Sequence, residues 1–138
     1  MLTIELNQDS FFPGQMLRGE CHWSAPPETR SCPAKLSLGW RTEGRGDVDH
    51  DWYTQTMTLV PQMAVPFEWE IPAKAPLSYD GELIRILWEV VVISQRDSRL
   101  PKAFTARMEA ILANHDPKHV AIKPFRVVSE LAFTHGQE

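Results

Sequence analysis

The sequence predicts an all-β protein, an antiparallel β-sandwich formed by one domain. Apolar and polar residues alternate with a period of two in most segments of the chain. Turns that contain glycine and proline separate these segments at short intervals. The 138 residues, 43% hydrophobic and 23% charged, have the size and composition of one folded globular domain. We therefore expect residues 1–138 to form a single domain.

Alternation begins at the N-terminus and recurs in residues 2–6, 16–23, 34–42 and 65–71. In each segment every second residue is apolar or small, and the residues between are mostly polar or charged. Strands of this kind bury one face against a second sheet. Three of the four tryptophans expected in the core belong to these segments, and the fourth is Trp88 in residues 83–94. The apolar sets are Leu2, Ile4 and Leu6; Leu17, Gly19, Cys21 and Trp23; Leu36, Leu38 and Trp40; and Val65, Phe67, Trp69 and Ile71.

Residues 83–94 have two largely apolar faces, which predicts a long central strand with its second face partly covered. One face is wholly apolar, whereas the other combines Val91 and Ile93 with the charged Arg85 and Glu89. Residues 51–60, with threonine at every second position from Thr54 to Thr58, and residues 120–128 complete the expected strands.

Residues 102–113 fit the alternation less well. The segment is rich in alanine, and its large apolar residues Phe104, Met108, Ile111 and Leu112 have the i, i+4, i+7, i+8 spacing of a helix. It also alternates tolerably as a strand. We expect a short helix here, ended by Asp116-Pro117.

Composition and charge argue against several classes of protein. The net charge is −4 and no run of Lys or Arg is present, so we expect no nucleic-acid partner. No apolar run is long enough for a membrane span. Residues 1–6 lack the basic and apolar regions of a signal peptide, so we expect a cytoplasmic protein in which Cys21 and Cys32 stay as thiols.

Three stretches, taken in order, resemble the N-terminal β-sandwich of the arrestin family, including its bacterial sporulation-control-like relatives and the retromer subunit of the same fold. Pro13-Gly14 fits a type II turn, and Gly19 inside the next strand indicates a bulge or a close backbone approach. The stretches are Phe12-Pro13-Gly14-Gln15 with Leu17-Arg18-Gly19-Glu20; residues 36–44; and Ser78-Tyr79-Asp80-Gly81 leading into residues 83–92.

This resemblance implies an immunoglobulin-like sandwich of the arrestin N-domain type. It also implies a non-catalytic interaction or scaffold module that binds proteins through sheet edges and loops. Arrestins have two sandwich domains, whereas this chain has the length for one. Arrestins that sense receptor phosphates carry adjacent basic residues on the first strand, and residues 2–6 contain none. Phosphate sensing is therefore not implied.

We expect partner contacts at two sheet edges, formed by the first and the closing strand, and in the loops at residues 44–51 and 77–82. The partner is a protein of unknown identity, and free edges also favour a homodimer. The candidate contact residues are Thr3 and Glu5 on the first strand; Arg45, Asp47, Asp49 and His50 in the first loop; Trp52 and Tyr53 just after it; and Tyr79 and Asp80 in the second loop.

Two other functions compete with this interpretation. A small-ligand or carbohydrate binder would use exposed aromatic side chains such as Trp52 and Tyr53. A metal-dependent hydrolase would use His115 and His119 with the acidic loop at residues 47–51, but two histidines in a loop have no fixed common face. The sequence has no calcium-loop, nucleophile-elbow or phosphate-loop motif. We therefore expect no catalytic residue, no cofactor and no metal site.

Overall fold

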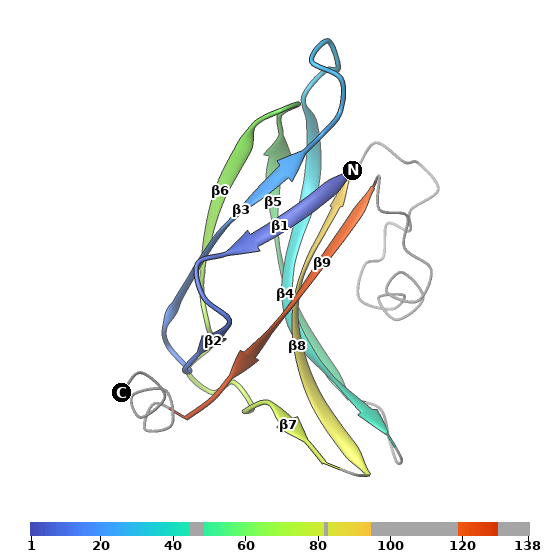
Figure 1. Cartoon of the computed structure of the whole chain (residues 1–138). Coiled ribbons are helices and arrows are strands. Elements are labelled where there is room, and N and C mark those ends of the chain that lie inside the picture. The colour runs from blue at the N-terminus through green and yellow to red at the C-terminus, as the bar shows by residue number, and fades with distance from the viewer. Residues whose placement is uncertain (45–48, 82, 95–118, 130–138) are drawn as a thin grey trace.

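The alternating segments form strands close to the positions that the sequence predicts. The computed structural model describes residues 1–44, 49–81, 83–94 and 119–129, and every regular element in these ranges is a strand (Figure 1). The helix expected at residues 102–113 lies outside the described residues. The strands are β1 (Leu2–Leu6), β2 (Ser10–Phe11), β3 (Met16–Trp23), β4 (Cys32–Gly44), β5 (His50–Leu59), β6 (Ala64–Glu70), β7 (Tyr79–Asp80), β8 (Ile84–Ser94) and β9 (Val120–Val127).

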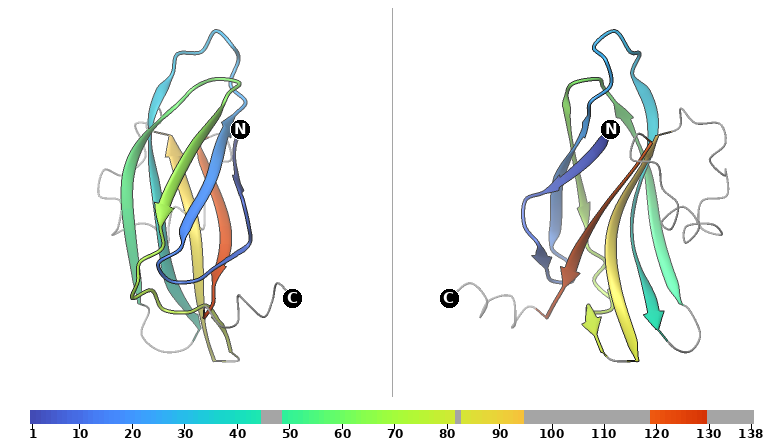
Figure 2. Two further views of the ribbon diagram at one scale, coloured as in Figure 1. Left: turned by 90° about the vertical axis from the view of Figure 1, so that its left-hand side faces the viewer. Right: turned by 45° about the vertical axis from the view of Figure 1, so that its right-hand side comes forward.

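The strands form two sheets that face each other (Figure 2). The smaller sheet has the order β1-β3-β6, and the larger has the order β2-β9-β8-β4-β5, with β7 paired to the end of β8. All pairings are antiparallel except the two-residue pairing of β2 with β9, which is parallel. The predicted all-β sandwich is confirmed, with this short parallel contact as a departure from a purely antiparallel arrangement.

The main core fills the space between the inner faces of the two sheets. Phe11, Phe125 and Trp88 form its aromatic centre, because the Phe125 ring lies 5.6 Å from the Phe11 ring and 5.8 Å from the Trp88 ring, centroid to centroid. Around this centre, β1 and β3 contribute Leu2, Ile4, Leu17, Cys21 and Trp23, and the larger sheet contributes Ala34, Leu36, Leu38, Val90 and Val92. These are the inner positions of the alternating pattern, so the period of two is what builds this core.

The outer face of the larger sheet carries a second buried cluster. Val91 has no exposed surface and Ile93 is 2% exposed, and both pack with Trp52 and Val120. The register explains the grouping, because Val91 pairs with Ile122 and Ile93 with Val120. The predicted covering of the second face of β8 is therefore confirmed.

Two glycine predictions are also confirmed. Gly14 has φ = 88°, and the amide of Gln15 donates to the Phe12 carbonyl at 3.0 Å, as expected for the turn before β3. A Cβ on Gly19 would lie 2.5 Å from the Glu5 carbonyl oxygen, so this position requires the close approach that only glycine permits.

Among the four tryptophans expected in the core, Trp23 and Trp88 are buried, whereas Trp40 and Trp69 are only partly buried at its border. No helix in the described part of the chain is long and apolar enough to cross a membrane.

Candidate interaction surfaces

The most exposed edge of the larger sheet is β5, which the sequence did not identify as an edge. It pairs with β4 from Arg41↔His50 to Cys32↔Leu59 and has no second strand neighbour among the described residues. Only Trp52 and Leu59 of its side chains are buried. The strand contains no proline and no lysine, the residues that commonly prevent pairing at natural edges. Within the described residues, no strand pairs with the backbone groups on the outer side of β5.

Trp52 and Tyr53 point to opposite faces of β5. Trp52 is 8% exposed and packs in the outer cluster, whereas Tyr53 is 37% exposed and its hydroxyl donates to Asp51 Oδ2 at 3.1 Å. Partial burial, together with the hydrogen bond to Asp51 and the charge of that carboxylate, raises the pKa of the Tyr53 hydroxyl. Tyr53 is therefore the exposed member of the pair, and it remains a hydrogen-bond donor.

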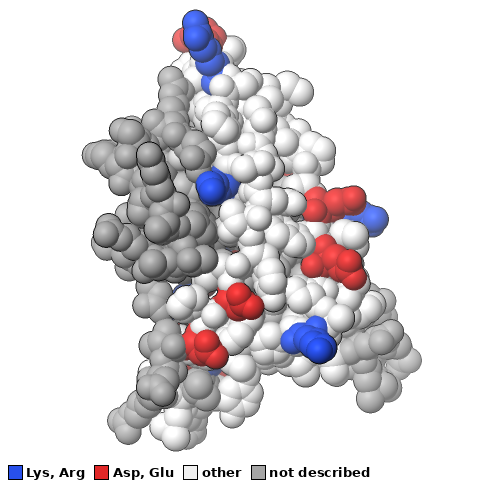
Figure 3. Space-filling view, turned by 180° about the vertical axis from the view of Figure 1, so that it is seen from behind, with Lys and Arg blue, Asp and Glu red and all other residues white. Residues whose placement is uncertain are grey.

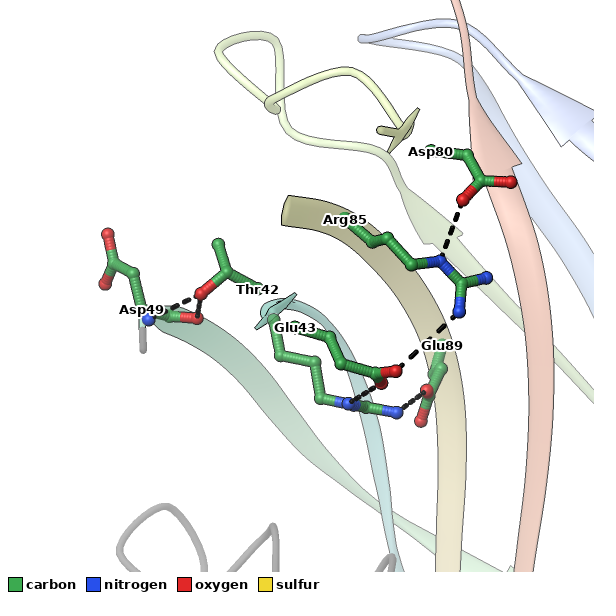
Figure 4. Close-up of polar contacts among 7 residues, drawn as sticks. Thr42, Glu43, Asp49, Asp80, Arg85 and Glu89 are labelled. Atoms are coloured by element: carbon green, nitrogen blue, oxygen red, sulfur yellow. Dashed lines mark hydrogen bonds and ion pairs between the residues drawn. The ribbon is translucent and has the colours of Figure 1, made fainter. Parts of the chain in front are cut away.

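The start of β5 is fixed by a reciprocal contact between Asp49 and Thr42. The Asp49 amide donates to the Thr42 hydroxyl at 2.8 Å (Figure 4). In return, the Thr42 backbone amide donates to the Asp49 carbonyl at 2.8 Å. This contact closes the end of the β4–β5 hairpin beside His50, which is exposed. The candidate residues Arg45 and Asp47 lie outside the described residues.

A chain of alternating charges crosses the lower end of the larger sheet in Figure 1. The contacts, some of which Figure 4 shows, run from Asp80 to Arg85 (2.9 Å), Arg85 to Glu43 (3.7 Å), Glu43 to Arg41 (2.9 Å) and Arg41 to Glu89 (3.0 Å). Burial alone would lower the pKa of Arg41, but the neighbouring Glu89 and Glu43 outweigh it and hold that pKa above its ordinary value. Arg41 therefore stays charged. The chain of ion pairs links Asp80 to Glu89 of β8, a central strand of the larger sheet.

A pocket of about 390 Å³ opens where β7, β8 and β9 meet. Its apolar walls include Tyr79, Trp88 and Phe125, and its charged lining includes Asp80, Arg85 and Arg126. Tyr79 itself is 55% exposed. The loop expected to contact partners thus forms one wall of a hollow that alternation alone did not reveal.

The first strand is an edge, as predicted. Among the described strands, β1 pairs only with β3, and Thr3 and Glu5 are exposed on its outer face. The closing strand, which was also predicted to be an edge, instead lies between β8 and β2. This prediction was wrong for the last part of β9, because Ser10 and Phe11 of β2 pair with Arg126 and Val127 there.

The described residues do not bring together the metal-ligating side chains that a metal-dependent hydrolase would use. His115 lies outside the described part of the chain, and His119 precedes β9, where its carbonyl accepts a hydrogen bond from the Ser94 amide at 2.7 Å. The face seen from behind in Figure 3 carries described side chains of both charges, some of which adjoin side chains of the opposite sign.

Sequence patterns missed several polar residues that the structure groups together. Arg41, Glu43 and Arg85 join Asp80 and Glu89 in the charge chain, and Glu20 and His22 lie beside Glu5. Only Glu89 could have been identified from the sequence, because a carboxylate in a nearly apolar strand requires a partner when it is buried. The others depend on the register between strands, which the sequence does not state.

No model of a known protein family matches the sequence, and no curated protein matches it. Among solved structures, the chain is similar to the sporulation control protein Spo0M from Bacillus subtilis, with a TM-score of 0.54 and 14% identity over 99% of this chain and 54% of that one. It is also similar to squid arrestin, with a TM-score of 0.53 and 12% identity over 91% of this chain and 48% of that one. The chain spans about half the length of both structures. The likeness confirms the predicted arrestin-like β-sandwich fold.

Proposed function

We propose that residues 1–138 form one domain that acts as a non-catalytic protein-interaction module, and that its partner adds a strand to the open edge of β5. The observation that carries the proposal is this edge, ten residues long and unprotected by proline or lysine. Strand addition gains its affinity from main-chain hydrogen bonds and its specificity from alternate side chains. The arrestin-like fold supports a binding role.

The side chains of β5 define the chemistry of the partner. Thr54, Thr56 and Thr58 are exposed on one face, and Tyr53 and Gln55 on the other. A partner segment that extends this sheet meets uncharged, hydrogen-bonding neighbours along most of its length. We therefore propose an extended partner segment rich in β-branched and polar residues, which pair favourably with threonine across strands.

Two of the candidate loops extend this surface at the same end of the sheet. Asp49 precedes β5 and His50 begins it. Asp80 pairs with Arg85 of β8, which in turn contacts Glu43 near the end of β4 (Figure 4). We propose that residues flanking the partner strand contact this end. Thr3 and Glu5 lie on the other sheet and form a separate edge.

The test compares the two edges by capture from a lysate. A Thr54→Lys/Thr56→Lys variant places two lysines on exposed positions of β5, and Thr3→Lys is the matched change on β1. We expect the parent chain and the Thr3→Lys variant to capture the same protein and the β5 variant to fail to capture it. Binding of that protein to the parent chain should also slow hydrogen exchange of the β5 amides. Retention of the partner by the β5 variant, or its loss with Thr3→Lys alone, would refute the proposal. Light scattering of the pure chain shows whether the partner is a second copy.

The pocket beside β7 favours a second candidate function, the binding of a small molecule. Its volume of about 390 Å³ falls within the range of about 300–1,000 Å³ typical of ligand pockets. The pocket is distinct from the ligand site expected at Trp52 and Tyr53, whose side chains lie on opposite faces. A fragment screen by NMR is the test, and chemical-shift changes that vanish in Tyr79→Ala would support binding in the pocket.

A further inference from the structure

Three side chains that can bind metal meet on the outer face of the smaller sheet. Glu5 of β1 lies directly opposite Glu20 of β3, and His22 follows Glu20 by two residues and so points to the same face. One ligand atom from each residue lies within 4.8 Å of the others. Because β1 and β3 are neighbours throughout β1, the backbone positions of all three residues are fixed by the sheet (Figure 1).

The imidazole of His22 faces the two carboxylates. Its Nε2 atom lies 3.4 Å from Glu20 Oε1 and 3.9 Å from Glu5 Oε2. The His22 side chain is 42% exposed, yet Nε2 itself is shielded from solvent and has no hydrogen-bond partner. A ring nitrogen in this position can donate a proton to a carboxylate or give its lone pair to a metal ion.

The distances favour the metal ligand over the ion pair. A charge-assisted N–H···O bond has a length of about 2.7–2.9 Å, and both contacts of His22 are clearly longer. Ligand bonds of about 2.0–2.2 Å at a tetrahedral zinc place neighbouring ligand atoms roughly 3.3–3.6 Å apart. The His22–Glu20 distance falls in this range. The Glu5 oxygen lies slightly farther away, at 3.9 Å from His22, and belongs to an exposed residue.

We propose that Glu5, Glu20 and His22 form a zinc-binding site with three protein ligands and a fourth position for water. The mixture of one imidazole and two carboxylates suits zinc, whereas calcium and magnesium take oxygen ligands. This site is separate from the β5 edge and does not depend on the proposed partner. It also differs from the His115 and His119 arrangement considered from the sequence.

Calorimetric titration of the purified full chain with zinc chloride tests the proposal. We expect His22→Ala and Glu20→Gln each to weaken one zinc-binding event by at least about tenfold, since even residues that only support zinc ligands contribute about 10–100-fold. Glu68→Gln is the matched control, because Glu68 lies on the same outer face and contacts Arg18 instead. The melting temperature should rise with zinc in the parent and in Glu68→Gln, and rise less in His22→Ala.

Zinc bound by other histidines would remain in all of these variants, so the comparison isolates the event at His22. The proposal is wrong if the parent chain binds no zinc at millimolar concentration. It is equally wrong if His22→Ala and Glu20→Gln bind every zinc ion as tightly as Glu68→Gln does. Either result would mean that the cluster is only a set of polar contacts between His22 and the two carboxylates.

Discussion

The ring of Trp52 lies directly against the backbone of Gly39, its cross-strand partner in β4. A Cβ atom built on Gly39 would come within 2.4 Å of Trp52 Cε3 and of the Asp51 carbonyl oxygen. Trp52 packs in the outer cluster on this face, whereas Tyr53, the next residue, points to the opposite face and is the exposed aromatic side chain of β5. Gly39 thus leaves the space that the Trp52 ring occupies.

Gly39→Ala should therefore destabilise the fold. The added methyl group must displace the indole or part the β4–β5 backbones, and overpacking of this kind costs about 1–3 kcal/mol. Urea denaturation followed by tryptophan fluorescence measures the loss. Lys35→Ala, a change on the same face of β4, is the control and should alter stability much less. An unchanged midpoint in Gly39→Ala would contradict the close contact.

Arg41→Met should destabilise the protein because it leaves the Glu89 carboxylate without its cation. The Glu89 side chain is 9% exposed and that of Arg41 is 23% exposed, so the pair is only partly screened by water. Loss of one partner of a fully buried pair costs about 3–5 kcal/mol, and partial exposure of Arg41 reduces our expectation to about 1–3 kcal/mol.

The control for this prediction is Arg18→Met. Arg18 and Glu68 form an exposed pair, and such pairs contribute about 0–1 kcal/mol. A double variant, Arg41→Met/Glu89→Gln, should recover part of the stability that Arg41→Met loses, because it removes the buried charge. Equal losses in the Arg41 and Arg18 variants, measured by denaturation, would show that burial of Glu89 does not matter.

Cys21 should make the protein less stable at alkaline pH. Burial raises the pKa of its thiol from 9.0 to about 12. Above pH 9 the unfolded chain loses a proton that the folded chain retains, so the free energy of unfolding falls as pH rises from about 9 to about 12, by up to about 1.4 kcal/mol per pH unit.

Cys21→Ala tests this pH dependence against the parent chain. The variant is less stable at neutral pH because of the cavity, but its stability should fall less steeply between pH 8 and pH 10.5. Parallel curves for the two proteins would contradict the prediction. In the folded parent at pH 8, a thiol reagent should modify Cys21 orders of magnitude more slowly than in the unfolded chain, since the thiolate is the reactive form.

The β5 edge should be visible in hydrogen exchange of the free protein. Amides of β5 that face away from β4 have no strand partner in the described part of the chain. They should exchange much faster than amides of the central strand β8, which lies between β4 and β9. Within β5, fast and slow amides should alternate, because the backbone groups point alternately toward and away from β4. Uniformly slow exchange along β5 would mean that another segment covers the edge.

Most of the architecture could be predicted from local patterns. Alternation placed β1, β3, β4, β6 and β8, and it assigned Leu36, Leu38, Val90 and Val92 to the inner face. It succeeds because a residue's face in a strand is a local property, set by its position in the period of two. Turn chemistry succeeds for the same reason, as the positive φ of Gly14 shows.

The surfaces were harder to predict because they depend on which strands become neighbours. No pattern in the sequence of β5 identifies it as an edge strand. No pattern in the sequence of β9 predicts that Ser10 and Phe11 pair with its last residues. The same limit explains the metal-ligand candidates, since Glu5 and Glu20 are fifteen positions apart and become neighbours only through the register of β1 with β3. The sequence alone determined an arrestin-like β-sandwich and the inner face of most strands. Only the tertiary structure decided the edges, the pocket and the polar clusters, because these are built by pairing between distant segments.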